Sequence, residues 1–391
     1  MWNLLRNKSW PIGLDIGTDS IKMLQVRKVG AVLGVCACGR WRFPESVGGD
    51  ASARRKLTIE AVRQMLRQGN FRGRRVVSCL SCSQLSIKNI RLPHVEEDQM
   101  RQAVESEARE RFPFDVTLDQ LAYLNAGQIR QGTEVRDEII LMAARREAVE
   151  DHLQMLADMG LTPVYIESEP IALFRVFERF LRRKADEPSV TVVVDIGRSA
   201  TRVIIARGRQ IVFVKNIDIA GRHLTAAVAK QLNLSLEEAL DLRLRSMSGQ
   251  EDAAPAPAAP EGGARAEKDP NSLNWTLRDA IRGETEALAR EIALCLRYCS
   301  VTFRGIRPDR VNLPGGEAYD PALAQLLGEH LSVECVVAQP LRGIDVSPVD
   351  FGTDRRGMLS EWAVAVGLAI RDVRLAQVLP EEDHGQDRLS A

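Results

Sequence analysis

A short motif occurs twice in this chain and limits the folds that it can adopt. Residues 12–22 read Ile-Gly-Leu-Asp-Ile-Gly-Thr-Asp-Ser-Ile-Lys, and residues 192–202 read Val-Val-Val-Asp-Ile-Gly-Arg-Ser-Ala-Thr-Arg. In each copy a buried apolar strand runs into a tight polar turn and then into a second strand. Two copies, 180 residues apart, predict a duplicated α/β domain and not a solenoid, which needs three or more repeats.

The turn in each copy has the chemistry of a phosphate-binding site. Gly17 and Gly197 permit positive φ or a close approach of the backbone, and successive turn amides form a concavity that binds anions. Asp15 and Asp195 end their strands at the same cleft, where carboxylates can hold Mg²⁺ through its waters. Asp and Gly are common turn residues, so a single motif would be weak evidence. The duplication favours a nucleoside triphosphate held from both sides.

A third glycine-rich turn follows in the second half of the chain. Residues 311–318 read Val-Asn-Leu-Pro-Gly-Gly-Glu-Ala and precede a helical pattern over 321–331. Gly315 and Gly316 would let the backbone approach a flat ligand such as adenine, although the same residues also suit an ordinary strand-to-helix turn. The sequence contains no G-x-x-x-x-G-K-[ST] motif, and no G-x-G-x-x-G opens a helix. It therefore does not support a P-loop or a Rossmann cofactor site.

Composition excludes several other classes of protein. The chain has 53 Lys and Arg against 53 Asp and Glu, which argues against a nucleic-acid-binding protein. No run approaches 18 apolar residues, so we expect no transmembrane helix. The seven cysteines lack metal-ligand spacing, since the C-x-x-C pair Cys79 and Cys82 has no second pair or His cluster. We expect all seven to be reduced thiols.

Hydrophobic patterns between and after the two copies predict the remaining organisation. A compact α+β unit is expected over 85–160, inserted between the copies. Glu169 precedes a helix at 171–180, where it either complements the helix dipole or faces the cleft as a catalytic group. Residues 248–272 are rich in Pro, Ala and Gly and are predicted to be a disordered loop. The other expected helices are 54–69, 95–111, 145–159, 274–302 and 362–373, and two strands at 119–126 and 136–144 flank a turn at 127–132.

Five stretches together resemble the PilM family of type IV pilus assembly proteins, in the actin-like ATPase superfamily. They are Gly13–Lys22, Glu110–Asp115 (Glu-Arg-Phe-Pro-Phe-Asp), Gly160–Leu173, Val194–Gly197 and Leu313–Ala318. Singly these motifs are shared with other actin-like proteins; their order, and the segment around Pro113, favour the PilM family. The similarity spans residues 10–375.

The resemblance implies an actin-like ATPase fold with duplicated ribonuclease-H-like halves and an FtsA-like subdomain arrangement. Subdomain 1A would comprise 1–84 with 161–188 and 358–380. The inserted subdomain 1C, at 85–160, would bind a partner. The second half (2A and 2B) would cover 189–357, and residues 381–391 would form a polar tail.

The resemblance also implies that ATP with Mg²⁺ binds between the halves. The first phosphate loop would comprise Gly17, Thr18, Asp19, Ser20 and Lys22. The second would comprise Gly197, Arg198, Ser199 and Thr201, and the adenosine loop Gly315, Gly316 and Glu317. Asp15 and Asp195 would be the metal-facing acids, and Glu169 is the one residue we can name as a general base.

The partner that the resemblance implies is the cytoplasmic N-terminal segment of a PilN-like inner-membrane protein. The chain would link that protein to the pilus assembly motors at the cytoplasmic face of the inner membrane. Self-association is also compatible with the family, whereas nucleic acid and direct transmembrane insertion are not expected.

Three departures from the family pattern weigh against tight ATP binding and rapid hydrolysis. Asp19 would repel a triphosphate unless a cation compensates. Arg198 could clamp a phosphate, or could fill the pocket with Asp19 as its partner. Leu240 and Arg243 stand where relatives tend to read Glu and Lys, so a ribose contact is missing. Whether the protein is a weak ATPase therefore stays open.

Other functions from the same superfamily were weighed against a scaffold. A sugar kinase would need an aspartate base deep in the first half, and no convincing candidate is present. An FtsA-like filament protein would carry an amphipathic C-terminal helix, whereas the tail after Pro380 is acidic and polar. A relative of the type II secretion protein GspL would carry a transmembrane helix. A nucleotide-binding scaffold with little turnover is the prediction.

Overall fold

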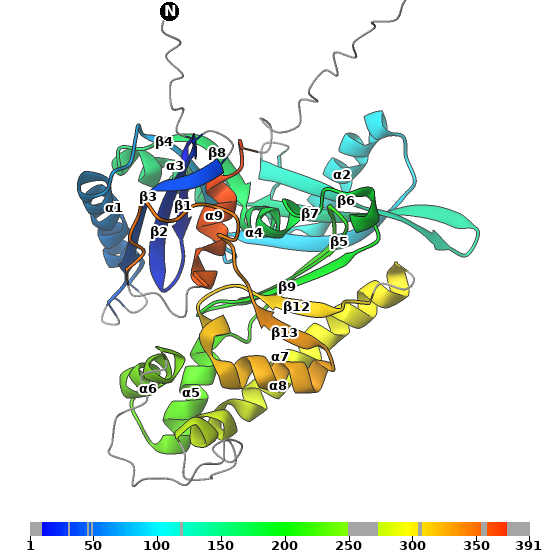
Figure 1. Cartoon of the computed structure of the whole chain (residues 1–391). Helices are drawn as coiled ribbons and strands as arrows, with labels where there is room; N and C mark the ends of the chain where they lie inside the picture. The colour runs from blue at the N-terminus through cyan, green and yellow to red at the C-terminus, as the bar shows by residue number, and fades with distance from the viewer. Residues whose placement is uncertain are drawn as a thin grey trace, which may run out of the picture.

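Figure 1 shows the protein as a computed structural model, which describes residues 10–373 apart from seven gaps. The gaps are 30–31, 45–46, 48–49, 118–119, 249–272, 304–306 and 353–357. The predicted disordered loop at 248–272 lies outside the described residues except for Ser248, and so does the predicted polar tail at 381–391.

Two five-stranded sheets share one strand order. The first runs β3-β2-β1-β4-β8 and the second β11-β10-β9-β12-β13. In each sheet the repeated motif supplies the central strand and its antiparallel neighbour, and parallel strands follow on the other side. The bounds of the first sheet are β1 Ile12–Ile16, β2 Ser20–Val29, β3 Val32–Arg42, β4 Arg75–Leu80 and β8 Thr162–Ser168. Those of the second are β9 Val190–Ile196, β10 Thr201–Arg207, β11 Gln210–Ile217, β12 Arg310–Leu313 and β13 Glu334–Val337. The predicted duplication of an α/β unit is confirmed.

Four helices cover the first sheet, and one of them comes from the far end of the chain. They are α1 (Ala51–Gln68), α3 (Arg146–Asp158), α4 (Glu169–Glu178) and α9 (Ala363–Ala369). Figure 1 shows α9 beside β1 and β2, more than 300 residues away in sequence. Two glycines make this packing possible: a Cβ on Gly13 would overlap the backbone of α9, and a Cβ on Gly367 would overlap the carbonyl of Ala172 on α4.

A three-stranded sheet is formed by residues that come between the two halves in the sequence. It has the order β5-β7-β6, with bounds Leu85–Pro93, Glu134–Ala144 and Leu121–Gln131, and it carries α2 (Glu97–Arg111). One face packs against the apolar side of α2. The other contributes side chains to the core of the second half, next to β11. The inserted unit is therefore joined to the second half by buried apolar surface.

Two details differ from expectation in this region. The predicted turn at 127–132 is wrong, because β6 continues to Gln131 and β7 begins at Glu134. Gly127 instead lies at an irregularity in the strand pairing and has a φ of 113°, which glycine adopts without strain. Helix α3 was expected inside the 85–160 unit, but it packs against α1 and β8 in the core of the first half. We therefore place the end of the inserted unit after Ala144.

The described residues of the second half form four α-helices. They are α5 (Gly221–Leu232), α6 (Leu236–Ser248), α7 (Leu273–Thr302) and α8 (Pro321–Leu331). Asp320 caps α8 by accepting hydrogen bonds from the amides of Ala322 and Leu323. None of the described helices is long and apolar enough to cross a membrane. The seven cysteines, all of which are described, are free.

A buried histidine joins α3 to the first sheet. His152 is 3% exposed, and its Nε2 lies 3.1 Å from the hydroxyl of Ser78 on β4. Burial lowers the pKa of His152 to about 4, although Asp151 acts in the opposite direction. In the folded protein the His152 imidazole is therefore neutral. In the unfolded chain the same imidazole has the ordinary histidine pKa of 6.5 and is protonated below that pH.

This histidine should make the folded state sensitive to acid. Between pH 6.5 and 4, His152 is protonated in the unfolded chain but not in the folded one. The free energy of unfolding therefore falls as the pH falls through that window. At about 1.4 kcal/mol per unit, His152 should cost the protein up to about 3 kcal/mol at pH 4. Urea unfolding of the wild type and of His152→Gln at several pH values measures this. Parallel pH profiles for the two proteins would contradict the prediction.

Candidate functional site

The two repeated turns have the same hydrogen bonding. The Gly17 amide donates to the Ser20 carbonyl at 3.0 Å, and the Gly197 amide donates to the Ala200 carbonyl at 3.0 Å. Both turns therefore close in the same way and present the end of a central strand to the space between the halves. The predicted equivalence of the two motifs is confirmed at the level of backbone geometry.

Each turn carries a buried carboxylate paired with a cation on the next strand. The strand register places Asp15 opposite Lys22 and Asp195 opposite Arg202. Lys22 Nζ lies 3.3 Å from Asp15 Oδ2, and Arg202 Nη2 lies 2.6 Å from Asp195 Oδ2. Arg202 also binds Glu169, with Nη1 2.8 Å from Oε2. All five side chains are at most 10% exposed.

Burial sets the protonation of this group. It raises the pKa of the Glu169 carboxyl to about 7, an effect that Arg202 opposes and the nearby Asp15 and Asp195 reinforce. Burial acts to lower the pKa of Arg202, but Glu169 and Asp195 outweigh it and keep that pKa above its usual value. A carboxyl that titrates near neutrality is suited to proton transfer. Arg202 nevertheless anchors Glu169 and limits its freedom to act on a ligand.

The third glycine-rich turn, at 315–317, packs against the carboxylate of Asp195. Gly315 has a φ of 93°, and a Cβ there would overlap Asp195 Oδ1. Its amide donates to the Ser360 carbonyl at 3.1 Å. The next residue, Gly316, has an ordinary φ of −73° and open space where a Cβ would be. The structure therefore requires glycine at 315, whereas at 316 it leaves room for a ligand.

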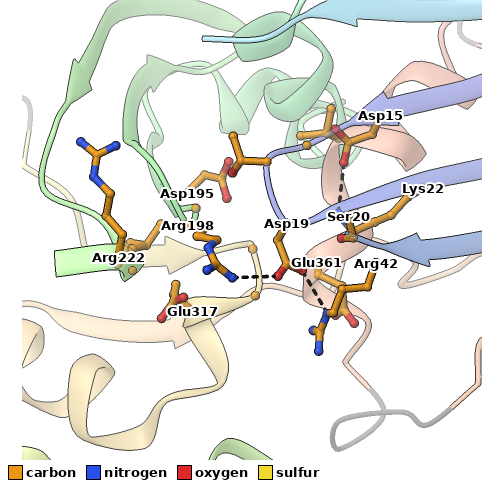
Figure 2. Close-up of a pocket in the computed structure, with 18 of the residues that line it drawn as sticks. Asp15, Asp19, Ser20, Lys22, Arg42, Asp195, Arg198, Arg222, Glu317 and Glu361 are labelled. Carbon is orange, nitrogen blue, oxygen red and sulfur yellow. Dashed lines mark hydrogen bonds and ion pairs between the residues drawn. The ribbon is translucent and has the colours of Figure 1, made fainter. Parts of the chain in front are cut away.

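The three turns meet at a cavity of about 240 Å³ between the halves (Figure 2). Of the residues expected at the site, this cavity is lined by Asp15, Gly17, Thr18, Asp19, Ser20, Lys22, Glu169, Asp195, Gly197, Arg198, Gly315, Gly316 and Glu317. Ser199 lines an adjoining hollow of about 60 Å³. Thr201 lines neither: it is fully buried, and its hydroxyl donates to the Ile219 carbonyl at 2.6 Å. Thr201 thus supports the strand instead of facing the cavity.

Charges of opposite sign balance within the cavity. Six cations and six carboxylates line it, namely Lys22, Arg40, Arg42, Arg198, Arg202 and Arg222 against Asp15, Asp19, Glu169, Asp195, Glu317 and Glu361. Arg222 is the one cation among them for which the described residues provide no ion pair. An anionic ligand must therefore compete with carboxylates of the protein for most of these cations.

Asp19 forms the link that spans the cavity. Figure 2 shows its carboxylate between Arg42, whose Nε lies 3.3 Å away, and Arg198, whose Nη1 lies 3.7 Å away. Arg42 belongs to the first half and Arg198 to the second. Of the two roles considered for Arg198, the pairing with Asp19 is present in this structure, and it connects the two phosphate-loop candidates.

Part of the cavity wall is apolar and was not foreseen. Leu236, Leu240, Leu244 and Met247 line it from α6. Their spacing puts them on one face of a helix, so a periodicity count over 236–247 could have indicated the wall. Arg243, expected only as a departure from the family, is buried behind it and binds Glu317 and Asp320 at 2.7 and 3.0 Å. Through these two ion pairs, Arg243 holds the turn at 315–317 in place.

This combination suits a ligand with a flat apolar part and an anionic part. The α6 wall and Gly316 would accept the former, and the two turns with Lys22 and Arg198 the latter. In the described chain, no group of three or more His, Cys, Asp and Glu side chains converges as metal ligands do. Asp15 and Asp195 are the carboxylates at the ends of the two turns that could hold Mg²⁺ together with phosphate oxygens.

Comparison with known proteins places these features in a family. The family model described as type IV pilus assembly protein PilM matches residues 13–251, more than half of the chain. A model for the cell division protein FtsA matches residues 192–328. A solved structure of the PilM-PilN type IV pilus biogenesis complex superimposes with a TM-score of 0.72 and 24% identity, over 93% of this chain and 98% of that one. The ethanolamine utilization protein EutJ from Carboxydothermus hydrogenoformans superimposes with a TM-score of 0.51 and 15% identity, over 94% and 91%.

Proposed function

The chain belongs to the PilM family of type IV pilus assembly proteins, and from that premise we propose that it is a nucleotide-binding scaffold of pilus assembly with little turnover. It has the actin-like ATPase fold. The observation that carries the proposal is the meeting of two equivalent turns, one from each half, at a single cavity. A ligand that touches both turns would fix the halves relative to each other, which is what a nucleotide-dependent scaffold needs.

ATP with Mg²⁺ is the ligand that we propose for the cavity. The backbone of 17–20 and 197–199 would hold phosphates, with Lys22 and Arg198 as counter-charges. Gly315 and Gly316 would approach the adenosine, whose base would lie on the α6 wall, and Asp15 and Asp195 would face the metal. Little turnover is proposed because Arg202 anchors Glu169, the one candidate base, and because Asp19 occupies cations that a γ-phosphate would use.

We further propose a PilN-like inner-membrane protein as the partner. The solved complex with 24% identity contains PilM and PilN, and the inserted unit at 85–144 supplies a separate surface for such a segment. Binding there would keep this protein at the inner face of the membrane and connect it to the pilus motors. An FtsA-like filament protein is the second candidate, because the FtsA model matches 192–328. The PilM match favours the first, since it also covers the inserted unit.

Filling the cavity at Gly316 should abolish nucleotide binding and leave the fold intact. Gly316 has helical backbone angles and an open Cβ position, so Gly316→Leu adds bulk inside the cavity without backbone strain. We expect wild-type protein with saturating Mg-ATP to gain stability as RT ln(1 + [L]/Kd), about 2.7 kcal/mol at 100 times Kd. Thermal unfolding should show this as a rise of several degrees, and Gly316→Leu should show none.

A matched glycine provides the control. Gly283 lies on the exposed face of α7 with nothing near its Cβ position, so Gly283→Leu should keep the full response to Mg-ATP. Both variants should still bind the cytoplasmic segment of a PilN-like protein from the same organism. A wild type that does not respond to millimolar Mg-ATP, or that does not bind that segment, would overturn the corresponding part of the proposal.

A further inference from the structure

A basic hollow lies on the surface away from the nucleotide cavity. The linker from α4 to β9 and the turn between β10 and β11 enclose about 820 Å³. Five cations line it, Arg182, Arg183, Lys184, Arg207 and Arg209, against two carboxylates. The whole chain has equal numbers of acidic and basic residues. Positive charge is therefore concentrated locally in this hollow, although the chain as a whole has no net charge.

For two of these cations, the described part of the chain offers no ion-pair partner. Arg209 pairs with Glu178 at 3.2 Å, and Arg183 pairs with Asp186 at 3.2 Å. Lys184 and Arg207 are exposed and form no ion pair within the described parts of the chain. Unpaired cations in a hollow attract an anionic ligand more strongly than cations that already hold a carboxylate.

A second hollow adjoins the first at Arg207 and adds apolar surface. It has a volume of about 430 Å³ and lies between the three-stranded sheet and the end of α7. Arg130 contributes a further cation for which the described residues offer no ion pair, and Val301, 72% exposed, contributes an apolar side chain. Phe303 lines the same hollow. The combined surface thus presents cations beside an apolar rim.

A backbone hydrogen bond connects the two segments that line the first hollow, the α4–β9 linker and the β10–β11 turn. Gly208, at the tip of the β10–β11 turn, has a φ of 54°, and its amide donates to the Ser189 carbonyl at 2.8 Å. A Cβ at 208 would lie 2.8 Å from the Glu187 carbonyl oxygen, so only glycine lets the turn approach the linker this closely. The backbone beneath the hollow, held in place in this way, loses little conformational entropy when a ligand binds.

We propose that these two hollows form a docking site for an acidic peptide segment of a partner protein, one that carries an apolar side chain among its carboxylates. Such a segment would place carboxylates on Lys184, Arg207 and Arg130 and an apolar side chain against Val301 and Phe303. A bilayer surface is the alternative occupant, and an apolar side chain between carboxylates distinguishes the peptide from it. The site is independent of the nucleotide cavity, with which it shares no lining residue.

Charge reversal with a matched control tests the proposal. The probe is a fluorescein-labelled Glu-rich peptide with one central Leu, followed by fluorescence anisotropy. We expect the double variant Lys184→Glu/Arg207→Glu to bind about tenfold more weakly than wild type, a change of about 1.4 kcal/mol, and Arg130→Glu to weaken binding to a smaller extent. The control Lys56→Glu/Arg101→Glu makes the same charge change at exposed residues of α1 and α2 that pair with no acid among the residues the structure describes. It should bind within about twofold of wild type.

Further arms separate this site from its alternatives. A peptide with Gln in place of Glu should bind weakly, and added salt should weaken the Glu-rich peptide. Gly316→Leu should bind the Glu-rich peptide like wild type, so that failure of the nucleotide proposal would leave this one standing. Equal losses in the two charge-reversed proteins would overturn the proposal. So would binding to phosphatidylglycerol vesicles without binding to the peptide, or the absence of peptide binding to wild type.

Discussion

Replacing Arg202 with methionine should lower the free energy of unfolding by roughly 3–5 kcal/mol. Its guanidinium is the cation that binds both Asp195 and Glu169, and all three side chains are at most 10% exposed. Methionine fills the space of the side-chain stem but leaves the buried Asp195 carboxylate without this counter-charge, whereas Glu169, whose pKa Arg202 holds down, takes up a proton. Removing one member of a buried ion pair is costly because the remaining charge stays out of water.

Thermal unfolding followed by circular dichroism measures this effect, with an expected fall of roughly 5–10 °C. Arg245→Met is the matched control, since Arg245 pairs with Asp241 on the exposed face of α6 and each is more than half exposed. Exposed pairs contribute at most about 1 kcal/mol. Adding Asp195→Asn to Arg202→Met should restore part of the loss by removing the unpaired charge. Similar melting temperatures for Arg202→Met and Arg245→Met would contradict a structural role for the buried group.

Replacing Asp19 with serine should strengthen the binding of Mg-ATP by about tenfold or more. The carboxylate of Asp19 now occupies Arg42 and Arg198 and would repel a phosphate placed beside it. Serine removes the charge and keeps a small polar side chain, so both guanidiniums become available to phosphate oxygens. Asp19 is about one-third exposed, and solvent screening therefore reduces the gain to about 1–2 kcal/mol.

Isothermal titration calorimetry with Mg-ATP tests this prediction. Asp309→Ser makes the same change at an exposed acid that precedes β12, the strand whose other end leads to the 315–317 turn, and it should leave the affinity unchanged. Arg198→Ser should bind more weakly than Asp19→Ser, because it removes a cation instead of an anion. If Asp19→Ser bound Mg-ATP no better than wild type, the carboxylate would not compete with phosphate.

Regular patterns in the sequence were enough to predict the duplicated architecture. Asp15 and Asp195 stand at equivalent positions of the two sheets because the motif fixes both the strand end and the turn that follows. The helix predicted at 321–331 occurs with those bounds, since Asp320 and Pro321 mark its start. Features that depend on local sequence, such as turns, caps and short strands, could thus be found without the structure.

Features that depend on strand register and on contacts between distant residues could not be predicted from the sequence. Arg40 and Arg42 enter the cavity because β3 pairs with β2 so that they lie opposite Lys22 and Ser20. No local pattern indicates that pairing. Thr201 has the spacing of a phosphate-loop residue, but its side chain points the other way and bonds to Ile219. The turn expected at 127–132 failed for a related reason: Gly127 can serve either a turn or an irregular strand, and the partner strand decides which.

The contact between Gly13, Gly367 and Ala172 has a consequence for biosynthesis. Residues 190–337 contain every strand of the second sheet in one continuous segment, so that sheet can form as soon as this part has left the ribosome. The first sheet lacks the cover of α9 until residue 369 has been made, and meanwhile exposes the apolar surfaces of β2 and α4. Contacts between segments so distant in sequence form slowly. We therefore expect the nascent first half to be prone to aggregation, and to benefit from a chaperone, until α9 has been made.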